Sequence, residues 1–92
     1  MNILLFTTFT CKACQAHKKE VCRVSEEYQI PVRSIDIDDP LTFRVALNAM
    51  KEYGLRTNPS IVLRDDNNEV LKVIIGIRKS IETLEREINE RT

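Results

Sequence analysis

Two cysteines separated by two residues, in the segment Cys11-Lys12-Ala13-Cys14, have the most evident chemistry in this chain. They follow an apolar run that ends at Phe6 and they open a stretch with helical spacing, so we expect both sulfurs where a strand ends and a helix begins. The first turn of a helix stabilises a thiolate through its unpaired N–H groups and its dipole. Because the thiolate is the nucleophile in disulfide exchange, we expect Cys11 to attack and Cys14 to resolve.

The elements that would position this pair follow from the hydrophobic pattern. We expect a buried strand at 2–7, an amphipathic helix at 11–28, a half-exposed strand at 32–37, a helix from Asp39-Pro40 to Gly54, a hairpin of strands 61–63 and 70–75, and a helix from about Ser80. The first βαβ unit must be parallel and right-handed, and the hairpin antiparallel. The expected fold class is therefore α/β, with the order β-α-β-α-β-β-α and a mixed four-stranded sheet flanked by three helices.

The helix spacing also predicts the apolar side of each helix. The first helix presents Cys14, His17, Val21, Val24 and Tyr28 on one side, and the second presents Phe43, Ala46, Leu47 and Met50. Asp39 has the character of a helix N-cap, and Pro40 suits the first helical position after it.

Composition limits the classes of function. The 92 residues form one small domain over 1–92, and 42% apolar with 30% charged residues is typical of soluble globular chains. Lysine plus arginine equals aspartate plus glutamate, 14 against 14, which argues against nucleic acid and anionic membranes as partners. The apolar runs are too short to span a bilayer and the N-terminus lacks a signal pattern, so we expect a cytoplasmic protein.

The third cysteine, Cys22, is not expected to join the pair. On a continuous helix it lies about 12 Å along the axis from Cys14, whereas a disulfide needs Cα atoms within about 7 Å. We interpret Cys22 as an inert residue at the edge of the buried face. A metal half-site is the alternative for the pair, but Cys22 and His17 share its helix and are spaced wrongly for tetrahedral zinc, so no metal is expected.

The order of elements, with Cys-x-x-Cys after the first strand and the segment from Glu52 to Leu63, resembles the thioredoxin family in its short, glutaredoxin-sized form. The resemblance covers nearly the whole chain. It implies a thioredoxin fold and a reversible Cys11–Cys14 disulfide, with Cys11 as nucleophile and Cys14 as resolving residue. It also implies that Pro59 is a cis-proline facing the cysteines, and that substrate contacts Lys12, Thr57, Asn58 and Pro59.

The chain departs from both branches of this family. Thioredoxins carry Trp-Cys-Gly-Pro-Cys, and their buried aspartate and its lysine partner correspond here to Leu5 and Ser34. His17, one helical turn from Cys14, is then either the substitute proton acceptor or a histidine packed under the helix. Glutaredoxins carry a basic residue where Thr8 stands and two glycines followed shortly by an aspartate where Gly76-Ile77-Arg78-Lys79 stands.

The resemblance implies a protein-disulfide reductase that needs no bound cofactor. Its reductant is a flavoprotein thioredoxin reductase or glutathione, and the missing double glycine favours the former. We expect a monomer acting on disulfide-bearing proteins, with ribonucleotide reductase as the family-level client. Lys12, Arg56 and Arg78 would lie near the pair, lowering the pKa of Cys11 and steering acidic partners, unless they are ordinary solvated charges. The alternatives are a glutathione-dependent glutaredoxin and a redox-inactive binding module of the same fold.

Overall fold

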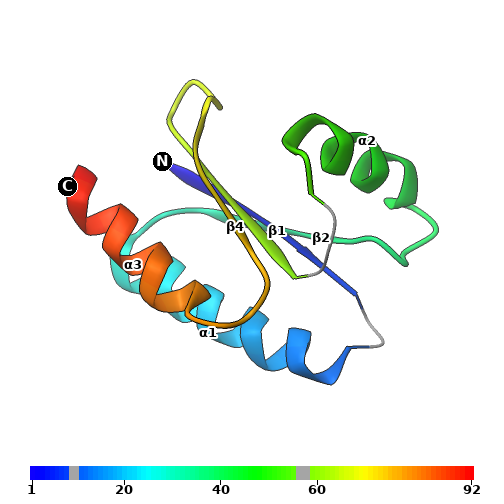
Figure 1. Cartoon of the computed structure of the whole chain (residues 1–92), viewed down its shortest axis with the longest axis horizontal. Helices are drawn as coiled ribbons and strands as arrows, with labels where there is room; N and C mark the ends of the chain where they lie inside the picture. Colours follow the sequence, from blue (N-terminus) through cyan, green and yellow to red (C-terminus); the bar gives the residue numbers. More distant parts are fainter. Residues whose placement is uncertain (9–10, 56–58) are drawn as a thin grey trace.

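The computed structural model describes residues 1–8, 11–55 and 59–92, which form a sheet with helices on both faces (Figure 1). In chain order the elements are β1 (Asn2–Thr7), α1 (Lys12–Tyr28), β2 (Val32–Asp36), α2 (Phe43–Tyr53), β3 (Ser60–Arg64), β4 (Val70–Ile75) and α3 (Ser80–Arg91). This order, with three helices and a mixed four-stranded sheet, confirms the predicted fold class.

The strands lie in the order β2-β1-β3-β4, so the apolar strand β1 is in the interior of the sheet. β1 is parallel to β2, and the β1–β3 and β3–β4 pairs are antiparallel. The register places Thr7 at the end of β1 opposite Asp36 at the end of β2, and it places Phe6 opposite Ser60. The carboxyl ends of β1 and β2 and the start of β3 therefore meet at one end of the sheet.

The two faces of the sheet carry separate hydrophobic clusters. Side chains alternate along β1, so Ile3 and Leu5 face α1 and α3 whereas Leu4 and Phe6 face α2. Figure 1 shows α1 and α3 together on one side of the sheet and α2 alone on the other. On the first side, the helices contribute buried side chains from Val21, Val24, Leu84 and Ile88.

Helix α2 begins later than the sequence pattern predicts, and Asp39 is not its N-cap. The Asp39 carboxylate accepts the N–H of Leu41 at 2.9 Å, and its carbonyl accepts the N–H of Thr42 at 3.1 Å. Both groups therefore stabilise a turn, which delays the helix to Phe43 with Thr42 at the N-cap. The Thr42 hydroxyl donates to the carbonyl of Asp36 at 2.8 Å and ties this turn to the end of β2.

The apolar side of α2 is only partly buried. Ala46 is inaccessible and Met50 packs on the cluster beneath the helix, but Phe43 is 47% exposed and Leu47 is 42% exposed. Phe43 and Leu47 lie on the predicted apolar side of the helix but are not part of the core. The end of the helix was predicted correctly, because Gly54 caps it with the left-handed φ of +69° that glycine adopts without strain.

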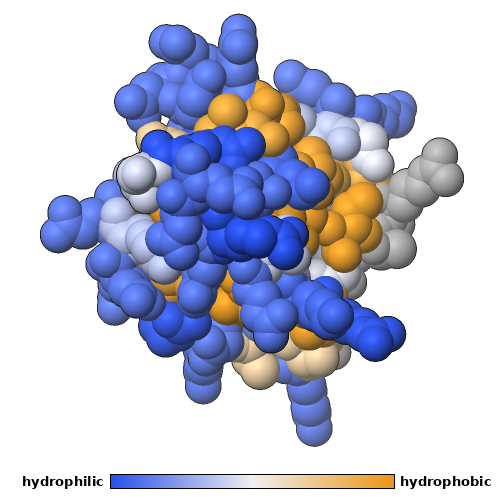
Figure 2. Space-filling model, turned by 60° about the vertical axis from the view of Figure 1, so that its left-hand side comes forward, coloured by the Kyte–Doolittle hydropathy of each residue, from blue (hydrophilic) through white to orange (hydrophobic). Residues whose placement is uncertain are grey.

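The side of the molecule that carries α3 is mostly hydrophilic, with hydrophobic side chains showing between the charged ones (Figure 2). Arg23 of α1 bridges to Glu85 of α3 at 2.8 Å, and its other nitrogens contact Glu20 and Glu27.

Within the described ranges, no helix combines the length and apolar character needed to cross a membrane.

Candidate functional site

Cys11 is the N-cap of α1. Its backbone is extended, with φ −96° and ψ 107°, and its sulfur accepts the backbone N–H of Cys14 at 3.1 Å. The sulfur thus takes the place that a serine or aspartate oxygen usually has at a helix start. The predicted position of Cys11, just before the first turn, is confirmed.

The two sulfurs of the pair differ in environment. Cys11 is partly exposed, whereas Cys14 is 1% exposed. The side-chain hydrogen bond from Cys14 lowers the pKa of Cys11, and the backbone N–H groups of Cys14 and Ala13 lower it further. Burial raises the pKa of Cys14, as do its hydrogen bond to Cys11 and the charge there. Cys11 is therefore the more acidic thiol and Cys14 holds its proton.

The carboxyl end of β1 lies beneath Cys14. The Thr7 side chain and the Thr8 backbone oppose the rise of the pKa of Cys14. Thr7 is completely buried. No role was predicted for Thr7, although a hydroxyl that ends an otherwise apolar strand, four residues before Cys11, was a detectable signal.

His17 is bound to α3 rather than to the cysteine pair. Its Nε2 lies 2.6 Å from Ser80 Oγ, and Ser80 donates its only hydroxyl proton to the carbonyl of Ile77 at 2.8 Å. His17 Nε2 must therefore be the donor, which leaves Nδ1 unprotonated. Burial lowers the pKa of this histidine, and it is not among the causes that shift the pKa of Cys14. This geometry favours the histidine packed under the helix over the proton acceptor.

Pro59 is buried at the same end of the sheet as the cysteine pair. Its carbonyl accepts the N–H of Gly76 at 2.9 Å, and the next residue, Ser60, begins β3 opposite Phe6. The other predicted substrate contacts on this segment, Thr57 and Asn58, lie outside the described residues. The same holds for Arg56 and for the Asn58–Pro59 peptide bond, so the predicted cis geometry stays a prediction.

Neither Lys12 nor Arg78 explains the acidity of Cys11. Lys12 and Arg78 are both exposed, and the charge of Lys12 is not among the causes that lower the pKa of Cys11. Hydrogen bonds from the first helical turn account for that acidity instead. Any role of Lys12 in substrate contact stays a prediction.

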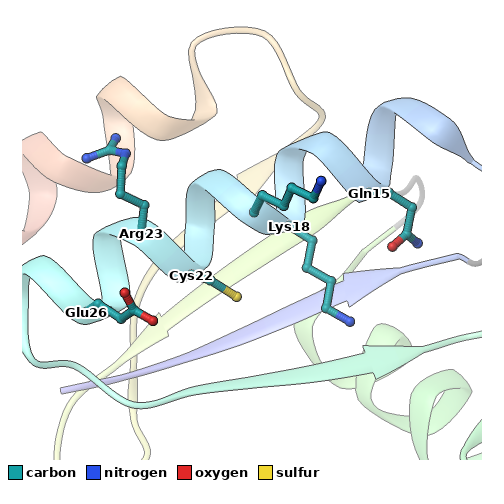
Figure 3. A pocket seen from close by; sticks show the side chains of 6 residues that line it. Gln15, Lys18, Cys22, Arg23 and Glu26 are labelled. Carbon is teal, nitrogen blue, oxygen red and sulfur yellow. The ribbon is translucent and has the colours of Figure 1, made fainter.

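Cys22 lies away from the pair, partly exposed in a groove of about 460 Å³ along the outer side of α1 (Figure 3). The groove is lined by Gln15, Lys18, Lys19, Cys22, Arg23 and Glu26. All three cysteines are free thiols. Over residues 1–8, 11–55 and 59–92, no cluster of three histidine, cysteine or carboxylate side chains is arranged to hold a metal ion.

Solved structures with the same fold include thioredoxins and a thio-disulfide isomerase. Thioredoxin O2 from Arabidopsis thaliana, in its oxidized state, has a TM-score of 0.76 at 17% identity and covers 97% of this chain and 72% of its own. Thioredoxin 1 from Thermosipho africanus has a TM-score of 0.72 at 19% identity, and the match covers 99% of this chain and 98% of that thioredoxin. A thio-disulfide isomerase from Thermus thermophilus has a TM-score of 0.70 at 21% identity, and the match covers 97% of this chain and 77% of the isomerase.

No curated protein has a sequence that matches this chain. A family model does match it over residues 1–89, and that family is described as TraF, the F plasmid transfer operon protein. The match covers nearly every residue, including the cysteine pair and Pro59. The fold and this match together establish that the chain belongs to the TraF family, a thioredoxin-like family.

Proposed function

We propose that this chain is a thiol-disulfide oxidoreductase that reduces protein disulfides through Cys11 and Cys14. The observation that carries the proposal is the opposite shift of two neighbouring thiol pKa values, lowered at the partly exposed Cys11 and raised at the buried Cys14. A dithiol reductase needs this asymmetry, because one sulfur must meet the substrate as a thiolate while the other keeps its proton until it is required.

The reaction would run in two exchanges. The Cys11 thiolate attacks one sulfur of a substrate disulfide, the disulfide bond breaks, and the departing thiolate takes up a proton. Cys14 then loses its proton and attacks Cys11 Sγ, which releases the second substrate thiol and leaves a Cys11–Cys14 disulfide. Two electrons pass from the dithiol to the substrate, so the protein needs an external reductant to return to the dithiol.

For that reductant we propose a flavoprotein thioredoxin reductase, because Gly76-Ile77-Arg78-Lys79 lacks the double glycine of glutathione-binding glutaredoxins. Glutathione is the competing reductant. Pro59 and Asn58 are the proposed backbone contacts for an extended substrate segment, with Lys12 and Thr57 beside them. Ribonucleotide reductase is one proposed client. We also propose that the protein is cytoplasmic and that it acts as a monomer.

The proposal is tested by trapping the intermediate between the two exchanges. In a Cys22→Ser background, Cys14→Ser should accumulate a mixed disulfide with insulin, seen as a mass increase on a non-reducing gel. Cys11→Ser should form none and should lose turnover with a dithiol reductant. If Cys14→Ser traps nothing, or if Cys11→Ser retains turnover, the two-cysteine mechanism is wrong and the redox-inactive binding module becomes the better hypothesis.

A redox titration measures the direction of electron flow. The Cys22→Ser protein, equilibrated in dithiol buffers and alkylated, should show one two-electron transition between about −200 and −270 mV, the range of cytosolic reductants. A transition near about −120 mV would instead identify an oxidant or isomerase. Absence of a reversible disulfide would contradict the enzymatic proposal.

A further inference from the structure

Three buried polar atoms have no hydrogen-bond partner within the described part of the chain: Thr7 Oγ1, His17 Nδ1 and Asp36 Oδ1. A buried polar atom without a partner loses its hydration and gains no hydrogen bond in return, so each such atom needs a structural or chemical explanation. All three belong to the layer between the sheet and helices α1 and α3. That layer also contains Cys14.

Thr7 and Asp36 are neighbours in this layer. They are Cα partners at the ends of the parallel strands β1 and β2, which lie about 4.8 Å apart. Partner residues of paired strands point to the same face, and the preceding partners Ile3 and Val32 both pack against the α1 cluster. The side chains of Thr7 and Asp36 therefore project side by side toward the start of α1.

The resolving step requires a proton acceptor that Cys11 does not supply. In the dithiol, the Cys14 thiol donates its hydrogen bond to the Cys11 sulfur. Once Cys11 has formed the mixed disulfide, its sulfur has no negative charge and becomes a poor acceptor. Cys14 is almost fully buried, so little water reaches its sulfur. A neighbouring side chain is therefore the nearest acceptor for its proton.

On the basis of the proposed thiol-disulfide exchange, we propose that Thr7 and Asp36 take the proton of Cys14 when Cys14 attacks the mixed disulfide. The Thr7 hydroxyl receives the thiol proton while its own proton passes to the Asp36 carboxylate, either after a rotation of the hydroxyl or through one water. Thr7 then donates a hydrogen bond to the Cys14 thiolate, which forms the bond to Cys11 Sγ as the substrate sulfur leaves. The substrate thiolate takes a proton from solvent, and Asp36 returns its own there.

Thr7 would therefore touch the reacting sulfur, and Asp36 would act through it as a positioning residue. Asp36 is half-buried at the edge of the sheet, where it can exchange protons with water. This exposure distinguishes it from His17, whose Nε2 is bound to Ser80 and whose ring is 4% exposed. Burial also lowers the pKa of His17 and weakens it as a base.

Several titratable groups of the described chain lie near this cluster, among them Asp38 and Asp39 in the turn after β2, where the N–H of Ile37 is bonded to the carbonyl of Thr7. α1 contributes Cys11 and His17, and β2 contributes Asp36. The segment before α3 contributes Arg78 and Lys79, which are exposed, and the side chain that α3 presents to His17 is the neutral hydroxyl of Ser80. The pH dependence of the resolving step is therefore compared between the parent protein and Asp36→Asn, in which all the other groups are the same.

The test separates the two exchanges with an aromatic disulfide whose thiol product is coloured, in the Cys22→Ser background. Attack by Cys11 releases one coloured thiol in a phase that depends on reagent concentration, and attack by Cys14 releases the second in a phase that does not. Thr7→Val keeps the side-chain shape and removes the hydroxyl. We expect it to slow the second phase by about tenfold to a hundredfold and to leave the first within about twofold. Asp36→Asn should act in the same way.

Control variants distinguish a proton path from a packing effect. Thr7→Ser keeps the hydroxyl and should restore most of the second phase. Glu52→Gln removes an exposed carboxylate of the same charge from α2 and should change neither phase. The second phase of Thr7→Val and of Asp36→Asn should need a higher pH than that of the parent, and the double variant should be no slower than the slower single variant.

Each result has a defined meaning. Equal slowing of both phases in Thr7→Val, no slowing in either variant, or slowing in His17→Gln instead would overturn the proton path while leaving the dithiol mechanism in place. Release of only one coloured thiol by the parent protein would instead contradict the proposed function itself. Circular dichroism of every variant verifies that the fold is retained.

Discussion

The helices on the two faces of the sheet differ in how completely their apolar side chains are buried. On the face covered by α1 and α3, Val21, Val24, Leu84 and Ile88 are completely inaccessible and interlock with the inner residues of β1 and β3. On the face covered by α2, only Ala46 of that helix is fully buried. Leu41, Phe43, Val45 and Leu47 in and before α2 remain 42% to 91% exposed.

This difference matches the location of the cysteine pair. Cys14 and His17 lie on the buried side of α1, Thr7 and Asp36 lie beneath its start, and Ser80 of α3 holds His17 in place. Rigid packing is needed there, because hydrogen bonds and burial shift thiol pKa values only when the distances are maintained. Helix α2 contributes none of these four residues, and its side chains are less buried.

The largest expected effect is a core truncation on the tightly packed face. Leu84→Ala should lower the free energy of unfolding by about 3 kcal/mol, because it leaves a cavity between α3 and the sheet. Its matched control is Leu47→Ala on α2, which should change stability by less than about 0.5 kcal/mol because that side chain is already largely in water. Urea unfolding of both variants, followed by circular dichroism, gives the two values. Equal losses would contradict the difference between the faces.

A smaller effect is expected from the polar contact between α1 and α3. His17→Gln should cost about 1 to 3 kcal/mol at pH 8, because the flexible amide replaces a packed ring and must be immobilised to keep the buried hydrogen bond to Ser80. The folded state lowers the pKa of His17 from its usual 6.5, so unfolding takes up a proton below that pH. His17 therefore makes its full contribution to the free energy of unfolding above about pH 6.5. This contribution is lost as the pH falls from there through the lowered pKa.

The measurement for this prediction is the difference in unfolding free energy between parent and His17→Gln, taken from pH 8 down to pH 5. The difference should narrow as the pH falls. Acidic titrations elsewhere in the chain affect both proteins and cancel in the comparison. A difference that widens toward pH 5 would mean that His17 binds its proton more tightly in the folded protein than in the unfolded chain.

The smallest effect is expected at the surface link between the same two helices. Arg23 bridges Glu20, Glu27 and Glu85, but its side chain is 47% exposed. Arg23→Ala should therefore cost less than about 1 kcal/mol, and the loss should shrink further in high salt. A larger, salt-independent loss in urea unfolding would show that ion pairs rather than the core hold α1 to α3.

Local patterns were sufficient to predict the order of elements and the site of the cysteines. The apolar run of β1 predicted an interior strand, the spacing of Cys14, Val21 and Val24 predicted the buried side of α1, and Gly54 predicted the end of α2. The start of α2 was predicted wrongly. Asp39 can either cap a helix or stabilise a turn, and the turn is favoured because the Thr42 hydroxyl binds an acceptor outside the helix. That acceptor, the carbonyl of Asp36, belongs to another element.

The sequence by itself determined that Cys11 stands at a helix start, because an apolar strand followed by helical spacing leaves no other place for it. Only the tertiary structure decided what surrounds Cys14. The pairing of β1 with β2 brings Thr7 next to Asp36, and the packing of α3 on α1 brings Ser80 to His17. These contacts join residues 29 and 63 positions apart in the chain. Their partners are selected by strand register and core packing, which no local pattern encodes.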